Sequence, residues 1–252
     1  MLVGLKTTGV AGAPISSWIG AEGNLMAKEL TDPGPGAWGF PDETVDFLRD
    51  LKANNDREWF ARNKSAYEQA IKGPAKDFCA RMVDELQALT GMAHGAKIFR
   101  IHRDLRFSKD KRPYNTHLHI TFSPLQSRGL APAWFFGLDP DELTLGTGAF
   151  GFEKPGLETY RNCVLGPEGE KLDALLDGLL RDGMRQGEPE LKRVPAGFPP
   201  DHARGRLLRR KGLTIWRHFG GTEVATGAGA LAECVAAYRA MKPVYDWLAA
   251  AK

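Results

Sequence analysis

The sequence predicts one α+β domain in which an antiparallel sheet is flanked by N-terminal and C-terminal helices. Apolar residues recur at helical spacing in the first third of the 252-residue chain and again in its last third. Between these parts, from about residue 96 to 150, the period changes to two, which indicates strands. The strands follow one another directly instead of alternating with helices, which favours α+β over a doubly wound sheet.

Composition fits an ordinary globular domain and excludes several functional classes. The chain is 42% hydrophobic and 26% charged. Its 34 basic and 31 acidic residues leave a net charge of +3, too small to favour nucleic acid as a general partner. No apolar run approaches the length of a membrane span, so we expect no membrane association. The sequence makes no prediction about oligomeric state.

Cysteine usage indicates a reducing compartment. Cys79, Cys163 and Cys234 are odd in number, far apart and without a Cys-x-x-Cys pair, so we expect neither a disulfide framework nor a zinc ribbon. Residues 1–23 lack the basic start and apolar block of a signal peptide. We therefore expect a cytoplasmic protein.

The N-terminal segment is expected to be a flexible tail. Residues 1–39 are rich in Gly, Ala, Ser and Pro and show no sustained period, so we place the domain at 40–252. Met26 is a second candidate, beside Met1, for the physiological start.

Three helices should open the domain. The first begins at Pro41 and is ended by Asn54 and Asn55, with apolar residues at helical spacing before them. Asp56 is placed to cap the second helix. Gly73 should break that helix, and Pro74 suits the first turn of a third helix that runs to Leu89.

The strands are predicted from alternation. Residues 96–107 alternate apolar and polar side chains, except that Arg103 falls on the apolar side, and a turn-rich stretch follows at 108–113. Residues 118–122 alternate again. Residues 134–138 and 143–150 form a hairpin around an acidic turn. In its second strand, Gly146 and Gly148 either allow close approach of a backbone or ligand or are packing glycines.

The last third should be mostly helical. Helices are expected at 155–164, 167–184, 202–210 and 228–248, and a short strand at 212–219. We expect the basic residues between Arg204 and Lys211 to lie on a solvated helix face while Leu207 and Leu208 point inward. Binding of nucleic acid through this stretch and Trp216 is the less favoured alternative.

The densest group of polar side chains lies between Arg100 and His119. Six cations and two carboxylates give this stretch an excess of four positive charges. Guanidinium groups supply forked donors that match phosphate or carboxylate oxygens. The sequence therefore predicts an anion site. Its expected ligand-binding residues are Arg100, Arg103, Arg106 and Asp110. Its expected catalytic residues are Asp104, Lys111 and Tyr114.

The expected roles follow from side-chain chemistry. Asp104 would orient the arginines, and Lys111 or Tyr114 would handle a proton. If residues 99–107 form a strand, the side chains of Arg100, His102, Asp104 and Arg106 share one sheet face with His117 and His119. The structural alternative is that Arg103 and Asp104 belong to internal ion pairs that fix a loop.

Metal and cofactor sites are not expected. His102, His117 and His119 with Asp104 could present ligands to a transition metal, but a His-x-His pair is weak support and surface histidines are the favoured interpretation. The phosphate loop, the nucleophile elbow, the dinucleotide fingerprint and the His-Glu-x-x-His helix are all absent from the sequence.

The same stretch resembles the signature of an uncharacterised bacterial and fungal family, domain of unknown function 2461. The pattern is Arg100-x-x-Arg103-Asp104-x-Arg106-Phe107-x-x-x-Asp110-Lys111-x-x-Tyr114. Residues 40–60, with Asn-Asn and Glu-Trp-Phe, and residues 191–198, with Pro195, Gly197 and Phe198, resemble further elements of the family. The resemblance covers roughly residues 40–248 and implies no particular reaction.

Three functions remain in competition. The first is an enzyme or ligand-binding protein for a phosphorylated or carboxylated small molecule. The second is a structural or interaction protein whose polar cluster only locks the sheet. The third is a nucleic-acid-binding module, which the near-neutral total charge disfavours.

Overall fold

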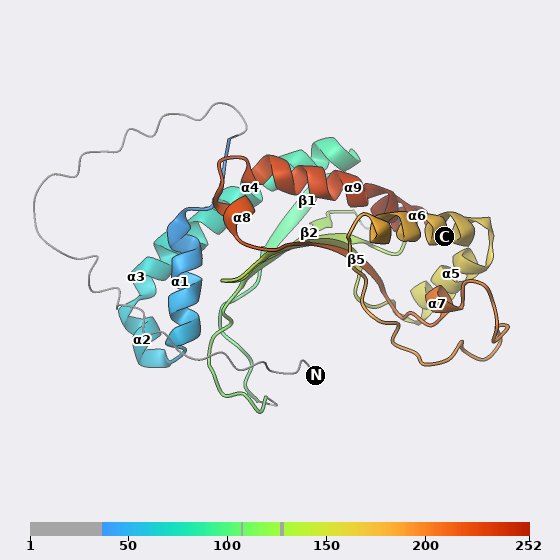
Figure 1. The fold of residues 1–252 in the computed structure, drawn as a ribbon, viewed down its shortest axis with the longest axis horizontal. Coiled ribbons are helices and arrows are strands. Elements are labelled where there is room, and N and C mark those ends of the chain that lie inside the picture. The colour runs from blue at the N-terminus through green and yellow to red at the C-terminus, as the bar shows by residue number, and fades with distance from the viewer. Residues whose placement is uncertain (1–36, 107, 127–128) are drawn as a thin grey trace, which may run out of the picture. The chain divides into compact units, whose positions relative to one another are not determined.

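Residues 37–252, except 107, 127 and 128, are described by a computed structural model (Figure 1). Gly34–Lys252 form one compact unit. The predicted class is confirmed, because five antiparallel strands pack with N-terminal and C-terminal helices. Residues 1–36 of the expected tail lie outside the described residues. Trp38, near the end of that expected tail, packs its ring against Phe40 and Phe78.

The elements follow the chain in a simple order. The strands are β1 (His94–Ile98), β2 (Leu118–Pro124), β3 (Ala133–Leu138), β4 (Leu143–Ala149) and β5 (Leu213–Phe219). The helices before the sheet are α1 (Asp42–Ala53), α2 (Arg57–Arg62), α3 (Lys64–Tyr67), the π-helical η2 (Glu68–Lys72) and α4 (Gly73–Thr90). The later helices are α5 (Lys154–Leu165), α6 (Pro167–Arg181), α7 (Gly205–Leu208), α8 (Glu223–Thr226) and α9 (Ala230–Ala250).

The sheet is an antiparallel meander in the order β1-β2-β3-β4-β5. The predicted β3–β4 hairpin is confirmed. Asp139 closes its turn, since its Oδ1 accepts hydrogen bonds from the backbone N–H of Asp141 at 2.7 Å and of Glu142 at 3.0 Å. This is the usual reason for Asp at the first position of a turn.

One face of the sheet carries the core. α4 and α9 pack against each other and against this face (Figure 1). Trp134 of β3 is fully buried and stacks on Tyr245 of α9, with ring centroids 4.6 Å apart. Phe78 of α4 meets Phe136 of β3 at 4.7 Å. Burial of aromatic side chains of this size dominates the energetics of a core.

The N-terminal helices are partly as predicted. Asp56 caps α2, because its carboxylate accepts the backbone N–H of Trp59 at 2.8 Å. The break expected at Gly73 is wrong: this residue has right-handed helical angles, and η2 runs directly into α4. Pro74, four residues after Ala70, has no N–H to donate to the Ala70 carbonyl, and the buried Thr44 hydroxyl donates to that carbonyl at 2.6 Å. A cross-helix hydrogen bond thus accompanies the irregular turn.

The strand predicted for residues 96–107 is also wrong in extent. β1 begins at His94 and ends at Ile98, and the following residues form a loop. Arg100, Asp104 and Arg106 therefore do not share a strand face. Phe107 lies outside the described residues.

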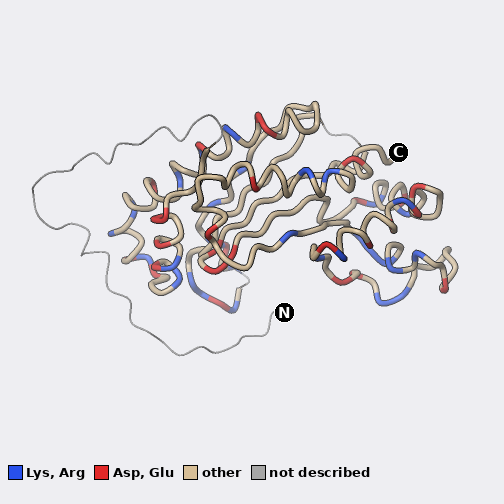
Figure 2. Tube along the Cα trace, turned by 45° about the horizontal axis from the view of Figure 1, so that its top comes forward, with Lys and Arg blue, Asp and Glu red and all other residues tan. Residues whose placement is uncertain are grey.

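Charge is distributed away from the sheet. The strands are almost free of charged residues, which gather on helices and loops (Figure 2), and Lys97 and Arg217 are the charged residues of the five strands. Among the helices that the structure describes, none combines the length and apolar character needed to cross a bilayer.

Candidate functional site

Residues 99–117, which connect β1 to β2, form a protruding loop that we call the basic loop. Its neck, where the two ends of the loop run side by side, is a short two-stranded ladder. The backbone N–H of Arg103 donates to the Pro113 carbonyl at 2.9 Å, and that of Asn115 donates to the Ile101 carbonyl at 2.7 Å. Between them, His102 and Tyr114 form an isolated bridge. The loop is therefore anchored at its base by backbone hydrogen bonds.

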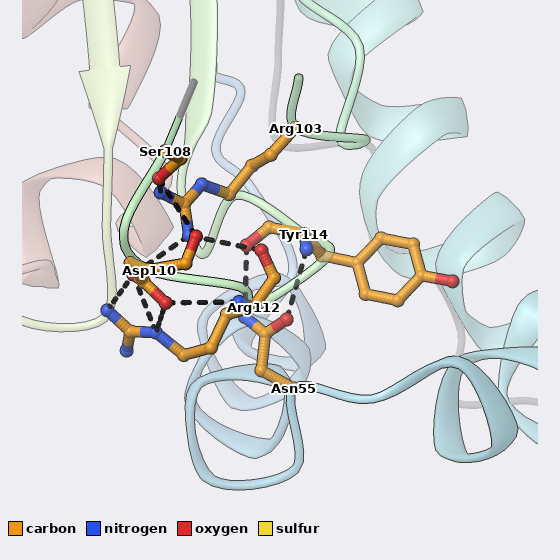
Figure 3. A network of polar contacts seen from close by, with 6 residues as sticks. All are labelled: Asn55, Arg103, Ser108, Asp110, Arg112 and Tyr114. Atoms are coloured by element: carbon orange, nitrogen blue, oxygen red, sulfur yellow. Dashed lines mark hydrogen bonds and ion pairs between the residues drawn. The ribbon is translucent and has the colours of Figure 1, made fainter. Parts of the chain in front are cut away.

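Arg103 is held inside the loop by the loop's own acceptors (Figure 3). Its guanidinium donates to the Asp110 carboxylate at 2.8 Å, to the Arg112 carbonyl at 3.1 Å and to the Ser108 hydroxyl at 3.4 Å. Its side chain is only 24% exposed. This arrangement matches the internal ion pair that the sequence left as the alternative interpretation of Arg103.

The Asp110 carboxylate accepts hydrogen bonds from two arginines. Besides Arg103, it accepts the Arg112 guanidinium at 2.7 Å and the Arg112 backbone N–H at 3.0 Å. These donors stabilise the ionised carboxylate and hold the pKa of Asp110 far below its ordinary value. The carboxylate is thus a fixed negative centre of the loop.

Asp104 and Arg106 form a second local pair. The Asp104 carboxylate accepts the Arg106 guanidinium at 2.6 Å and the Arg106 backbone N–H at 3.1 Å. The side-chain bond to Arg106 is the main cause of the lowered pKa of Asp104, and the charge of Arg100 lowers it further. Asp104 therefore orients Arg106, as expected, although both side chains stand in solvent.

Tyr114 is placed differently from the arginines. Its ring is buried and stacks on Phe60 with centroids 4.2 Å apart. Its hydroxyl points away from the network of Arg103, Asp110 and Arg112 (Figure 3). The structure therefore does not bring the phenol of Tyr114 together with the guanidinium groups.

A depression of about 650 Å³ lies between the start of α2 and the basic loop. Its charged lining consists of Asp56, Arg57, Glu58, Arg62 and Lys111. Lys111 donates to the Leu105 carbonyl at 3.3 Å. Among the described residues, no carboxylate oxygen lies within ion-pairing distance, 4.0 Å, of a charged nitrogen of Lys111 or Arg57. Both charges therefore remain available to an external anion.

The two carboxylates of this depression are only partly available to those cations. Asp56 is engaged as the cap of α2. Glu58 contacts Arg62 at 3.9 Å, and both side chains are highly exposed, so that ion pair is weak. The depression has three cations against two carboxylates, and its free charges are positive.

Arg100 is the remaining member of the predicted site, and it is solvent-exposed. Arg100 and Lys109 stand in solvent on the basic loop. Within the described part of the chain, neither has a carboxylate within ion-pairing distance. They add to the positive potential of the loop without belonging to the depression.

The histidines do not assemble a metal site. The rings of His117 and His119 stack with centroids 3.8 Å apart. Burial lowers the pKa of both imidazoles, that of His119 to about 4. His102 packs edge-on against Phe60 and Tyr114. Across the described residues, no group of three or more His, Cys, Asp or Glu side chains is arranged to hold a metal ion.

The second basic stretch is not the solvated helix face that the sequence favoured. Leu207 and Leu208 point inward as expected. Arg204, however, donates to the α5 carbonyl of Val164 at 2.7 Å, and Arg206 pairs with Asp173 of α6 at 2.8 Å. These arginines connect elements far apart in the sequence, which explains why they are basic without being free.

Sequence reasoning missed Asn55, Arg57 and Arg62. Asn55 makes two hydrogen bonds with the backbone of Tyr114, and the two arginines line the depression. The signal was present in the Asn54-Asn55 pair, which lies in one of the segments that resembled the family. Asn55 is predicted from sequence only as part of a helix end, because its partner Tyr114 lies 59 positions away along the chain.

Fold and loop together define a single-domain α+β protein in which, among the described residues, Arg57 and Lys111 lack a carboxylate partner in the depression between α2 and the β1–β2 connection. The chain belongs to the DUF2461 family of conserved hypothetical proteins, whose family model matches residues 43–247. The match includes α2, the whole basic loop and the Arg204–Lys211 stretch. A search of the curated proteins finds no match.

Proposed function

We propose that this protein binds a phosphorylated or carboxylated small molecule in the depression between α2 and the basic loop. The observation that carries the proposal is the pair of cations, Lys111 and Arg57, that line this depression without a carboxylate partner among the described residues. Lysine offers a compact charge, and arginine offers a planar fork that fits oxyanions. An oxyanion would supply the missing negative charge.

The rest of the basic loop has a supporting role in this proposal. Arg103 and Asp110 hold the loop in shape, and Asp104 holds Arg106. Arg100 and Lys109 raise the local positive potential, which attracts anions from a distance. If the bound molecule also reacts, Lys111 is the group placed to exchange a proton with it. The three free cysteines agree with the proposed cytoplasmic location.

The test compares two lysines of the same loop. Thermal unfolding is measured with inorganic phosphate, pyrophosphate and citrate at constant ionic strength. Binding stabilises the folded state, so the transition temperature should rise with anion concentration. Lys111→Ala should remove most of this rise, whereas Lys109→Ala should keep most of it, because Lys109 is exposed outside the depression and adds only a long-range attraction that salt screens. Equal responses of wild type, Lys111→Ala and Lys109→Ala would contradict the proposal.

One observation favours a second candidate, a structural or interaction protein. Asp110 offsets one of the two positive charges of its partners Arg103 and Arg112 within the loop. If that network were the whole purpose of the charges, no anion of the panel would stabilise the protein, and Arg103→Met would reduce stability without any effect on binding.

A further inference from the structure

The second face of the sheet is uncovered over much of its width. On β2, Leu118, Ile120 and Phe122 are buried in the core, whereas His119 and Ser123 on the other face are exposed. Strand register extends this face across the sheet, since His119 pairs with Gly137, Gly137 with Thr144, and Thr144 with His218. We call it the open face.

The open face carries an aromatic platform at β3–β5. The Trp216 ring lies on Gly146 of the neighbouring strand, so closely that a Cβ at Gly146 would come within 2.4 Å of a ring carbon. Phe135 stacks on Trp216 with ring centroids 5.4 Å apart. Phe150 lies 5.7 Å from Trp216 and is 68% exposed. The three rings form contiguous apolar surface, which marks interaction sites more often than single exposed apolar side chains do.

The platform is held rigidly. The Trp216 indole N–H donates to the Thr214 hydroxyl at 2.9 Å, which fixes the orientation of the ring. Glycine at position 146 leaves the space that the ring occupies. A ring fixed in advance loses little conformational freedom when a second ring stacks on it.

A positive charge stands beside this platform. Arg185 and Trp216 exchange two backbone hydrogen bonds, of 2.8 and 2.9 Å. Residues directly opposite in an antiparallel pair project to the same side. The exposed Arg185 side chain therefore belongs to the open face, and among the described residues no carboxylate lies within 4.0 Å of its guanidinium nitrogens.

Hydrogen-bonding groups lie beside the platform in the direction of the strands. Thr144 and His218 are two residues further along β4 and β5, about 7 Å from the Trp216 row. The Thr144 hydroxyl lies 3.4 Å from Nδ1 of His218, which also contacts Glu142 at 3.2 Å. The open face thus offers an aromatic surface with a cation beside it across the strands and a group of donors and acceptors further along them.

We propose that the open face around Trp216 binds a planar heteroaromatic ligand that carries a negative charge, of the nucleotide class. The ring stacks on Trp216 and Phe150, the anionic group pairs with Arg185, and the polar edge of the ring faces Thr144 and His218. Charge complementarity selects an anion over a neutral or cationic ligand. The inference is independent of the anion site at Lys111, because it rests on different residues and on ring stacking.

The experiment uses adenosine monophosphate, adenosine and inorganic phosphate as probes, with binding measured by calorimetry. Adenosine tests the ring alone, and the monophosphate is measured in the Lys111→Ala background, which excludes the depression. Trp216→Leu and Phe150→Ala should each weaken both nucleoside probes about tenfold, the usual effect of losing one stacking partner. Phe150 is exposed, so its variant tests the platform even if Trp216→Leu does not fold.

Matched arginines complete the test. Arg185→Ala should weaken the monophosphate and leave adenosine unchanged. Arg217→Ala lies on β5 one position beyond Trp216, on the opposite side of the strand, and should change neither. Absence of monophosphate binding, or equal losses in Arg185→Ala and Arg217→Ala, would overturn the inference. So would affinity that survives the loss of both aromatic rings. Loss of phosphate binding in Lys111→Ala alone bears only on the proposed function.

Discussion

Asn55 is hydrogen-bonded to the backbone of Tyr114 in both directions. Its Nδ2 donates to the Tyr114 carbonyl at 3.0 Å, and its Oδ1 accepts the Tyr114 N–H at 3.0 Å. The Asn55 side-chain amide thus pairs with the Tyr114 backbone as a residue of a neighbouring strand would. Since Asn55 lies just before α2 and Tyr114 at the neck of the basic loop, this pair fixes the two walls of the depression relative to each other.

Asn55→Ala should therefore lower the free energy of unfolding by about 1–3 kcal/mol, because two backbone groups lose partners in a partly buried place. Asn54→Ala is the matched control. Asn54 is exposed, and among the described residues its side chain bonds only the Asp50 carbonyl of its own helix end, at 3.0 Å, so its loss should cost about 1 kcal/mol or less. Urea denaturation measures both. Equal small effects would mean that the Asn55 contact does not hold the loop.

Arg103 and Arg112 share one carboxylate but differ in burial. The Arg103 side chain is 24% exposed and that of Arg112 is 59% exposed. Arg103→Met should lower the free energy of unfolding by about 1–3 kcal/mol, since it leaves several acceptors without their donor. Arg112→Met should cost about 1 kcal/mol or less, as exposed ion pairs do. The reverse order would show that Arg112, and not Arg103, organises the loop.

The lowered pKa of Asp110 predicts that acid destabilises the basic loop. Its pKa is lower in the folded state than in the unfolded chain, so its contribution to stability is present above about pH 4 and is lost as the pH falls towards the folded-state pKa. Asp110→Asn should reduce stability at pH 7 and flatten its dependence on pH below 4. A variant with the wild-type slope in acid would assign that slope to other carboxylates.

The sequence predicted elements whose signals are local. The β3–β4 hairpin carried both its alternation and its Asp139 turn, and Asp56 capped α2 where the pattern required it. The strand predicted to continue beyond Ile98 does not form, because alternation is a necessary but not a sufficient property of a strand. There the Asp104 and Asp110 side chains bond nearby backbone N–H groups and compete with a ladder.

Parts of the site could not be predicted because they depend on strand register and distant contacts. The sequence identified the basic stretch. Which of its cations are paired and which are available, however, depends on the loop conformation around Asp104 and Asp110. Gly148 shows the same dependence. It was one of two glycines expected to mark a close approach or simple packing, and the backbone of Leu213 in β5 leaves no room for a Cβ there. Only the β4–β5 register reveals that neighbour.

The lowered pKa of His119 predicts a second effect of pH on stability, which begins at a higher pH than that of Asp110. Desolvation of the His119 ring against His117 and Gly137, together with the charge of His117, lowers the pKa of this partly exposed residue to about 4, and Asp139 opposes the shift. The unfolded chain takes up the proton near pH 6.5 and the folded protein resists it, so stability is full above about 6.5 and declines towards pH 4. His119→Gln should reduce this decline and leave the stability profile above pH 7 unchanged. An NMR titration of His119 with a midpoint near 6.5 would contradict the expectation.

Gly146 and Trp216 should be coupled in stability as well as in space. Gly146→Ala places a methyl group 2.4 Å from a Trp216 ring carbon and should lower the free energy of unfolding by about 1–3 kcal/mol. The same change in a Trp216→Ala background should cost much less, because the ring that clashes is gone, and a double-mutant cycle measures the difference. Gly178→Ala in α6 is the control: nothing lies within 4 Å of its added Cβ, so it should raise stability by about 0.5–1 kcal/mol. Additive effects of Gly146→Ala and Trp216→Ala would mean that the indole does not rest on Gly146 in solution, and the aromatic platform would then lack its fixed floor.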